Sequence, residues 1–502
     1  MMKISIALLK TLSIWYLIIP VYLFLFGWVK PWISIPVCVA LVYAQFSVWS
    51  SLKRPFEAVI NFKVWHFLLL LFLCFWWVSF SGVGGFGLVL HDHHKTYSIA
   101  RDVMDQHLPV SYEVGGKRYF LASYIAYYLI APLIGGLFSY KLATLSLYIY
   151  ISLGIFLSIV WFTRLSGKNG ILAFLFFILI GGLDIAGFLF QNGFSEGSSR
   201  LLSGQYTLLY WANSFDLGKY LLYHGNTNLL FWAAPHAIST WMVSGIFFYE
   251  LLEEKSLKSS PIYLFTAVFW SPFVLVGLFP YFLFQLFKEG IKPYLRPANF
   301  LLIPAFVLLV WFVNSVGVSD LKKGLAFLPF TGFKPLVKDL LSIGWFVFFE
   351  VLVWACIVWW FIGKSLMGQW KKVFFLMTLI LCLIPLYRLG KYNDWVQRVS
   401  LPSLFLLWVF VLKSFSTRLQ VWKKLLFLVL LMLGSLDSLA WLYQSIRFNG
   451  ITFNHHPLPY DEVRTMPQAS LENDWPLEQV LAPEDASFFR YVAKKKPLTK
   501  TK

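Results

Sequence analysis

Apolar stretches long enough to cross a bilayer recur in this sequence from its first residues to about position 443. A transmembrane helix takes about 20 such residues, and a water-soluble fold cannot bury so many stretches of this kind. Only 13% of the 502 residues are charged, about half the share found in a soluble domain. We therefore predict an all-α, polytopic membrane protein with about eleven spans.

The net charge of +18 has a topological explanation. Lys and Arg lie in short clusters between the apolar stretches, which is the positive-inside pattern and not that of a nucleic-acid-binding surface. Lys3 and Lys10 accompany the first span, and Lys53, Arg54 and Lys63 follow the second. The N-terminus is therefore predicted to be cytoplasmic, and membrane lipids rather than nucleic acid are the expected partners.

Three long connections and the C-terminal tail are expected on the non-cytoplasmic face. The connections lie at about residues 87–121, 191–225 and 317–339, within a transmembrane domain that covers residues 1–443. The tail, residues 444–502, is too short and polar to form a domain of its own. Polar chemistry at the outer face is expected to come from these segments.

The segment from residue 261 to 287 is expected to enter and leave the membrane on the same side. Basic clusters flank it, and Pro272, Gly277 and Pro280 interrupt it, so we predict a broken or re-entrant hairpin. Irregular backbone inside a membrane is tolerated only where protein or a wet cavity surrounds it. This predicts a buried site close to the hairpin.

Ionisable residues gather near the predicted external face at four places. The first is the run His91-Asp92-His93-His94-Lys95, just after the third apolar stretch. Asp184 lies inside a span, where a carboxylate is costly and usually faces a wet or paired interior. His236 lies in another apolar segment, and Asp394 and Arg398 are four residues apart, so they share a helix face.

Five segments of the sequence resemble a known group of enzymes. They are HDHHKTYSIARD (91–102), GGLDIAGF (181–188), LLFWAAPHAI (229–238), WSPFVLVGLFP (270–280) and GKYNDWVQRVSLPSL (390–404). The first resembles the first-loop acidic motif of the bacterial polyprenyl-phosphate-dependent membrane glycosyltransferases of the GT-C superfamily. The others resemble stretches of poorly characterised members. Many relatives carry paired acidic residues in this loop, whereas here a single Asp is flanked by histidines.

This resemblance implies both a fold and an activity. The fold would be the helical membrane fold of the GT-C type. The activity would be transfer of a sugar from a polyprenyl-phosphate donor to a glycan, lipid or protein acceptor of the cell envelope. The active site would lie on the periplasmic or extracellular side of a bacterial inner (plasma) membrane.

The chemistry of such a transfer assigns roles to the ionisable residues. A sugar on a lipid phosphate has a good leaving group, so transfer needs a base and stabilisation of phosphate charge, but no cofactor or metal. We expect Asp92 to be the general base and Lys95 and Arg398 to bind the donor phosphate. The residues expected to position the substrates are His94, Asp184, His236 and Asp394.

Each of these side chains also has a structural alternative. Asp92 can cap a helix, Asp394 and Arg398 can form a structural ion pair, and His236 can be a hydrogen-bonded interior histidine. Three near-consecutive histidines cannot all converge from one helix face, so we expect no metal site at residues 91–94.

Two other functions are compatible with a polytopic membrane protein. A transporter or flippase of a lipid-linked saccharide would carry inverted repeats and polar groups near the membrane midplane. An O-antigen polymerase or ligase would carry a large external loop with arginine-rich motifs. Glu350 and Asp437 also lie in apolar spans, and the sequence assigns them no role.

Overall fold

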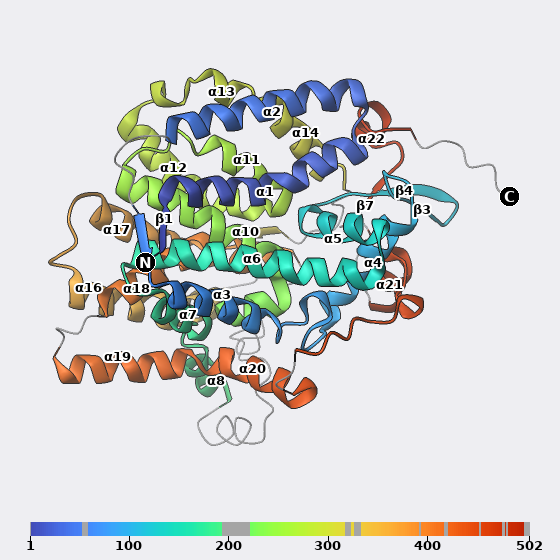
Figure 1. Cartoon of the computed structure of the whole chain (residues 1–502). Coiled ribbons are helices and arrows are strands. Elements are labelled where there is room, and N and C mark those ends of the chain that lie inside the picture. The colour runs from blue at the N-terminus through green and yellow to red at the C-terminus, as the bar shows by residue number, and fades with distance from the viewer. Residues whose placement is uncertain are drawn as a thin grey trace.

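The structure is a computed structural model that describes residues 2–52, 59–192, 221–316, 323–325, 333–390, 393–415, 420–450, 453–473, 477 and 480–495. Helices dominate, and many of the long ones lie side by side along one direction (Figure 1). Among these residues, eight helices are long and apolar enough to cross a membrane, or nine if one bent pair forms a single span. The helical, membrane-type fold therefore agrees with the prediction, whereas the number and direction of the spans stay predictions.

The helices of the N-terminal half begin at recognisable capping residues. Ser5, Ser139 and Asn169 each accept a hydrogen bond from the backbone N–H three residues later, which satisfies one of the unpaired groups at a helix start. The helices are α1 (Ile6–Trp28), α2 (Pro31–Leu52), α3 (Val64–Val78), α4 (His91–Asp105), α5 (Ala126–Leu137), α6 (Tyr140–Ser166), α7 (Gly170–Leu179), α8 (Asp184–Asn192) and α10 (Asn226–Tyr249).

The helices of the C-terminal half include the bent pair, α19 and α20. They are α11 (Pro261–Trp270), α12 (Pro272–Glu289), α13 (Pro297–Phe300), α14 (Ile303–Val313), α15 (Phe333–Val347), α16 (Val353–Ile362), α17 (Gly368–Leu383), α18 (Leu401–Ser414), α19 (Val421–Gly434), α20 (Leu436–Asn449), α21 (Met466–Asn473) and α22 (Ser487–Tyr491).

Helices α11 and α12 fold back on each other at Ser271. The side-chain amide of Gln285, near the end of α12, donates to the carbonyl of Lys255, just before α11, at 2.6 Å. The chain breaks only before Pro272, which is the first residue of α12, where proline is well tolerated. Gly277 and Pro280, which were also expected to break the segment, lie inside a continuous α12.

In the part of the chain that the structure describes, three π-helical turns occur, and each carries at least one ionisable residue. They are η3 (Glu250–Glu254), η5 (Phe348–Leu352) and η7 (Trp395–Val399), with Glu250, Glu350 and Arg398. Turns of this kind are rare and are enriched at functional sites. Glu250 is held by an ion pair with Lys10 at 3.0 Å, so this first turn has a structural partner.

The first predicted external loop and the C-terminal tail fold together at one end of the helices (Figure 1). Strands β3 (Ser111–Val114) and β4 (Lys117–Leu121) form an antiparallel hairpin, and β7 (Leu481–Pro483) pairs with β4. Beyond β7, Phe488 of α22 packs against Phe24 and Phe312 of the helix bundle. The described part of the tail is thus an integral part of this cap.

Two further strand pairs connect distant segments. Strand β1 (Met2–Ser5) pairs with β2 (Val59–Phe62), and β5 (Lys323–Leu325) pairs with β6 (Tyr387–Leu389). Most of the predicted 191–225 connection, and much of the 317–339 connection, lie outside the described residues.

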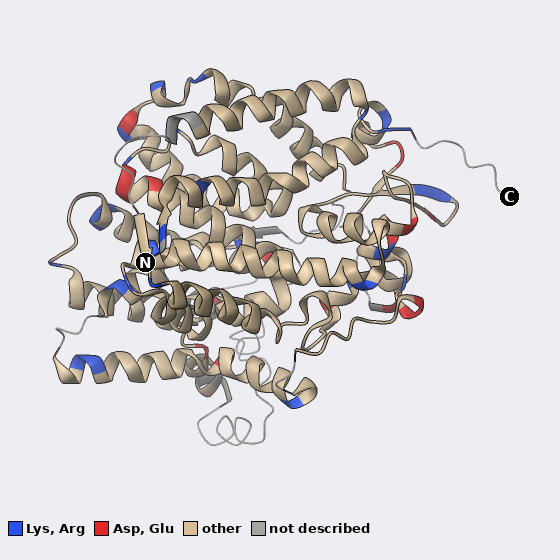
Figure 2. Ribbon diagram, in the orientation of Figure 1, with Lys and Arg blue, Asp and Glu red and all other residues tan. Residues whose placement is uncertain are grey.

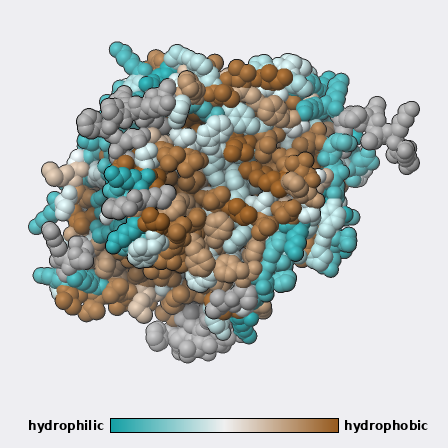
Figure 3. Space-filling model, in the orientation of Figure 1, coloured by the Kyte–Doolittle hydropathy of each residue, from teal (hydrophilic) through white to brown (hydrophobic). Residues whose placement is uncertain are grey.

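Charge and hydropathy divide the surface into two polar ends and an apolar middle. Lys and Arg gather at both ends of the ribbon, and the middle has few charged residues (Figure 2). Hydrophobic side chains cover much of the middle of the visible face (Figure 3). Large apolar side chains such as Trp32, Phe46 and Met432 are more than half exposed. An apolar belt of this kind suits contact with lipid.

Candidate functional site

Helix α4 begins at the His91 run and presents Asp92 in its first turn. The backbone N–H of Leu90 donates to Nδ1 of His93 at 2.9 Å, so the capping acceptor is His93 rather than Asp92. Asp92 is 51% exposed, and its side chain lies 3.8 Å from Nδ1 of His91. The carboxylate is thus accessible at the positive end of a helix dipole.

Tyr124 joins the segments that carry the predicted cations. Lys95 of α4 lies over its ring, with Nζ 5.9 Å from the centroid. Arg398 of η7 donates from Nη1 to the Tyr124 hydroxyl at 3.4 Å, and the ring of His236 in α10 lies 4.9 Å from the Tyr124 ring. Asp92 interacts electrostatically with Arg398. The structure therefore brings three predicted site residues, Lys95, Arg398 and His236, together around one tyrosine, and Asp92 lies within electrostatic range of Arg398.

A tight loop holds Asp394 against Arg398. Their ion pair measures 3.0 Å between Nη2 and Oδ1, and both side chains remain about a quarter exposed. Gly390 has a φ of 82°, and a Cβ on it would lie 2.8 Å from Oδ2 of Asp394, so the approach requires glycine. The contacts to Asp394 and Tyr124 occupy two of the five N–H donors that a guanidinium carries.

The broken hairpin reaches this cluster. Nδ1 of His236 lies 2.7 Å from the hydroxyl of Ser271, the residue at which α11 and α12 separate. Phe273, at the start of α12, lies under Arg398, with its ring centroid 5.5 Å from the guanidinium carbon. Ala233 has non-helical backbone angles, so α10 is kinked just before His236. Irregular backbone of α10 at Ala233 and of the hairpin at Ser271 thus lies beside this cluster of side chains.

Asp184 lies in a different place, against acidic residues instead of the two cations. It shares a hydrogen bond with Glu350 and interacts with Asp437, and all three side chains are buried. A Cβ on Gly182 would lie 1.3 Å from Oε2 of Glu350, so glycine is needed for this packing. Asp184 thus has acidic neighbours, and its expected role in positioning the substrates stays a prediction.

Polar side chains lie between this acidic cluster and the region of Arg398. The amide of Asn228 donates to Oδ2 of Asp437 at 3.0 Å. Nε2 of His224 lies 2.9 Å from Oε1 of Gln397, the neighbour of Arg398. Asp184 therefore has no direct contact with the cations among the contacts of the described residues.

Three aromatic or imidazole side chains belong to the site although the sequence did not identify them. Tyr124 contacts both cations, Tyr128 interacts electrostatically with Asp92 and Arg398, and His224 bonds to Gln397. The sequence placed His224 in the predicted 191–225 connection and gave the two tyrosines no role. Only the tertiary contacts set them apart from the many other aromatic residues of this chain.

The C-terminal tail is hydrogen-bonded to the other end of α4. Oδ2 of Asp102 accepts hydrogen bonds from the Tyr112 hydroxyl at 2.7 Å and from the backbone N–H of Met466 at 2.8 Å. Burial raises the pKa of Asp102 to about 6, even though both hydrogen bonds favour the charged form. The Arg101 side chain donates to the carbonyl of Val463. The helix that carries Asp92 is therefore positioned by the tail.

A pocket of about 380 Å³ lies between α4 and this part of the tail. His94 lines it, so this residue faces the tail and not the Tyr124 cluster. Burial lowers the pKa of His94, and a nearby carboxylate, Glu472, opposes that effect.

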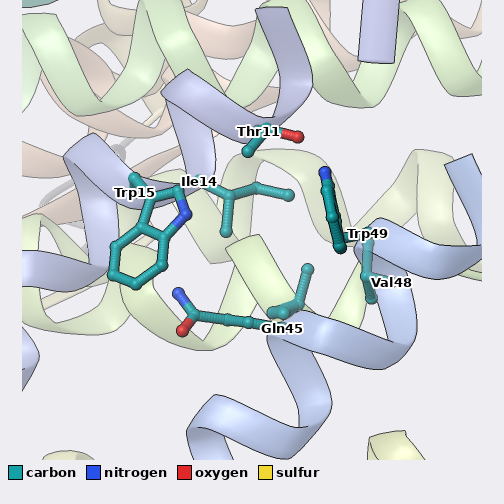
Figure 4. A pocket seen from close by; sticks show the side chains of 7 residues that line it. Thr11, Ile14, Trp15, Gln45, Val48 and Trp49 are labelled. Carbon is teal, nitrogen blue, oxygen red and sulfur yellow. The ribbon is translucent and has the colours of Figure 1, made fainter. Parts of the chain in front are cut away.

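A second cavity, of about 30 Å³, lies mainly between α1 and α2 and is far too small for a sugar (Figure 4). The labelled residues around it are Thr11, Ile14, Trp15, Gln45, Val48 and Trp49.

No metal site is evident in the part of the chain that the structure describes, where no three His, Cys, Asp or Glu side chains are grouped suitably. Comparison of the chain with family models, curated proteins and solved structures finds no match. Function must therefore be inferred from the chemistry of the residues themselves.

Proposed function

We propose that this protein is a GT-C-type membrane glycosyltransferase. It transfers a sugar from a polyprenyl-phosphate carrier to a glycan, lipid or protein acceptor at the non-cytoplasmic face of a bacterial inner membrane. The observation that carries the proposal is that two cations, Lys95 and Arg398, meet at Tyr124, while one accessible carboxylate, Asp92, lies on the same helix as Lys95 and interacts electrostatically with Arg398. A transferase that uses a phosphate leaving group needs these two kinds of group.

In the proposed reaction, an acceptor hydroxyl loses its proton to Asp92 as its oxygen bonds to the anomeric carbon of the donor sugar. The bond between that carbon and the phosphate oxygen breaks, and the electron pair leaves with the polyprenyl phosphate. Arg398 and Lys95 stabilise the negative charge that develops on the phosphate. The ion pair with Asp394 fixes the guanidinium in place, so little reorganisation is needed during the transfer.

The position of the cluster suits a lipid-linked donor. Ser271 and Phe273, at the break of an apolar hairpin, contact His236 and Arg398. The half-exposed Asp92 lies on the side of the polar cap. A carrier phosphate can therefore approach from the apolar belt while the acceptor approaches from the aqueous side.

The alternative function, a transporter or flippase of a lipid-linked saccharide, has one observation in its favour. Asp184, Glu350 and Asp437 form a buried acidic cluster among the helices, and intramembrane carboxylates often serve ion or proton movement.

Reconstituted wild-type protein distinguishes the two functions. Vesicles that contain radiolabelled polyprenyl-phosphate sugars and extracted envelope acceptors are assayed both for sugar transfer and for movement of the lipid between leaflets. Transfer without acceleration of lipid movement supports the glycosyltransferase. Accelerated lipid movement that depends on Asp184, with no transfer to any acceptor, rejects the proposal in favour of the transporter.

A further inference from the structure

The pocket between α4 and the C-terminal tail has the size of a small-molecule site. Its volume of about 380 Å³ lies within the usual range for ligand pockets, roughly 300 to 1,000 Å³, and is enough for one or two sugar rings. Leu458 contributes apolar surface, which suits the C–H face of a sugar ring. Tyr97 and Ser98 form the buried wall of the pocket, where the Ser98 hydroxyl donates to the carbonyl of His94 at 2.9 Å.

The charges around this pocket are mainly negative. Asp461, Glu462 and Glu472 contribute carboxylates, and Arg464 is the one Lys or Arg among the lining residues. Arg464 is already paired with Glu472 at 2.9 Å. An anionic ligand would therefore meet unfavourable charge here, whereas a neutral or amine-bearing ligand would not.

Helix α4 separates this acidic pocket from the cationic cluster at Tyr124. Lys95 contacts Tyr124, while His94 lines the pocket and interacts with Glu472. Asp92 lies in the first turn of the same helix, about 3 Å along the axis from His94 and about 4.5 Å from Lys95. The two sites of opposite charge thus adjoin the same turn of α4.

We propose that this pocket binds the acceptor, and that the acceptor is a neutral or amine-bearing saccharide and not an anionic one. This acceptor-pocket proposal rests on the proposed transferase function, because that function assigns the donor phosphate to the cationic cluster of Lys95 and Arg398. The segregation of charge keeps the donor phosphate out of the acceptor pocket.

The test measures binding directly, without any transfer reaction. Saturation-transfer NMR on the purified full-length protein in detergent compares glucosamine, methyl glucoside and glucuronate as probes. We expect glucosamine and methyl glucoside to bind at least about tenfold more tightly than glucuronate. In the double variant Asp461→Lys/Glu462→Lys, glucosamine binding should fall by about tenfold, because each exposed charge pair contributes up to about 1 kcal/mol.

A matched control reverses the charge of two exposed acidic residues, Glu484 and Asp485. They belong to the same polar cap but do not line the pocket. The variant Glu484→Lys/Asp485→Lys should bind all three probes as the wild type does. Both double variants alter exposed side chains, and equal melting temperatures would show that both remain folded. Binding of no probe, or equal binding of all probes by wild type and both variants, would overturn the acceptor-pocket proposal.

The acceptor-pocket proposal and the proposed function can fail separately. If transfer depends on Asp92 but the Michaelis constant for the acceptor is unchanged in Asp461→Lys/Glu462→Lys, only the pocket proposal is wrong. If the probes bind as expected but no transfer occurs with any donor, the pocket is a saccharide site and the transferase function is wrong.

Discussion

Among single residues, Arg398 shows how local backbone geometry can fix a cation. It lies in a π-helical turn, pairs with Asp394 four residues earlier and contacts Tyr124. The preceding loop uses Gly390 in a left-handed conformation, which brings the Asp394 carboxylate within reach. The position of the guanidinium therefore depends on a residue that has no functional group.

Replacing Gly390 with alanine should disturb the site through this loop. The left-handed φ costs about 1 kcal/mol for alanine, and the new Cβ would contact Oδ2 of Asp394 at 2.8 Å. We expect a lower melting temperature and a loss of transfer activity. Gly116→Ala is the matched control, because Gly116 also has a positive φ of 72° but nothing within 4 Å of its Cβ position. Equal activity loss in both variants would show that the clash with Asp394 is unimportant.

At the level of elements, α4 is fixed at both ends by titratable groups with opposite pH effects. His93 closes the first turn, and Asp102 anchors the last turns to the tail. Burial lowers the pKa of His93 to about 4 and raises the pKa of Asp102 to about 6. Their contributions to the pH dependence of stability therefore oppose each other between about pH 4 and 6.

His93 should make the protein less stable as the pH falls. In the unfolded chain it is protonated below its usual pKa of about 6.5, while the folded state keeps it neutral down to about pH 4. Stability is thus lost from about pH 6.5 to 4, by up to about 3 kcal/mol. His93→Gln keeps an acceptor for the Leu90 N–H but does not titrate. Melting temperatures in detergent should fall less on acidification in this variant; an unchanged pH profile would contradict the assignment.

Asp102 should act in the opposite direction. Its folded pKa of about 6 lies above the ordinary value of 3.8, so the folded state favours the proton, and stability is lost as the pH rises from about 4 to 6. Asp102→Asn retains an oxygen that accepts from Tyr112 and Met466. The melting temperature of this variant should rise relative to that of the wild type as the pH is raised to 7. A loss of stability that is the same at every pH would mean that the carboxylate's charge is not responsible.

For the whole molecule, the polar cap of α4, the β3–β4–β7 sheet and the tail marks one end of the helices (Figure 1). The N-terminal strand and the ion pair between Lys10 and Glu250 mark the other. The proposed orientation puts the cap outside the cytoplasm. It follows from the positive-inside pattern of the first two spans.

Cysteine labelling tests this orientation. The four native cysteines are first replaced, and single cysteines are introduced at two exposed positions, Glu484 in the cap and Lys364 after α16. A membrane-impermeant maleimide added to intact spheroplasts should label the residue-484 variant and leave the residue-364 variant unlabelled until the membrane is opened. The reverse pattern would place the cap, and with it Asp92, in the cytoplasm.

The sequence predicted those features that depend on local patterns. Apolar length indicated the membrane helices, the four-residue spacing indicated the Asp394–Arg398 pair, and Pro272 indicated the hairpin break. Features that depend on distant contacts were not predictable. Tyr124 meets Lys95 and Arg398 only because three separate segments converge, and nothing in its immediate sequence distinguishes it from other interfacial tyrosines.

The same limit applies to the tail and to Asp184. The tail was expected to be external and too short to form a domain of its own, and the pairing of β4 with β7 and the Asp102–Met466 bond make it part of the cap. Asp184 was expected to position the substrates because it is an intramembrane carboxylate near the predicted external face. Its actual neighbours, Glu350 and Asp437, lie more than 160 residues away in the sequence, so only the folded structure brings them together.

The most direct test of the central proposal is the rate of sugar transfer by Asp92→Asn in reconstituted vesicles. Asn has the same shape but cannot accept the acceptor proton, so the rate should fall by about 10² to 10⁴ with donor binding retained. Asp105→Asn, an exposed carboxylate in the last turn of the same helix, is the control and should retain most of the activity. Wild-type transfer by a folded Asp92→Asn variant would contradict the role of Asp92 as general base.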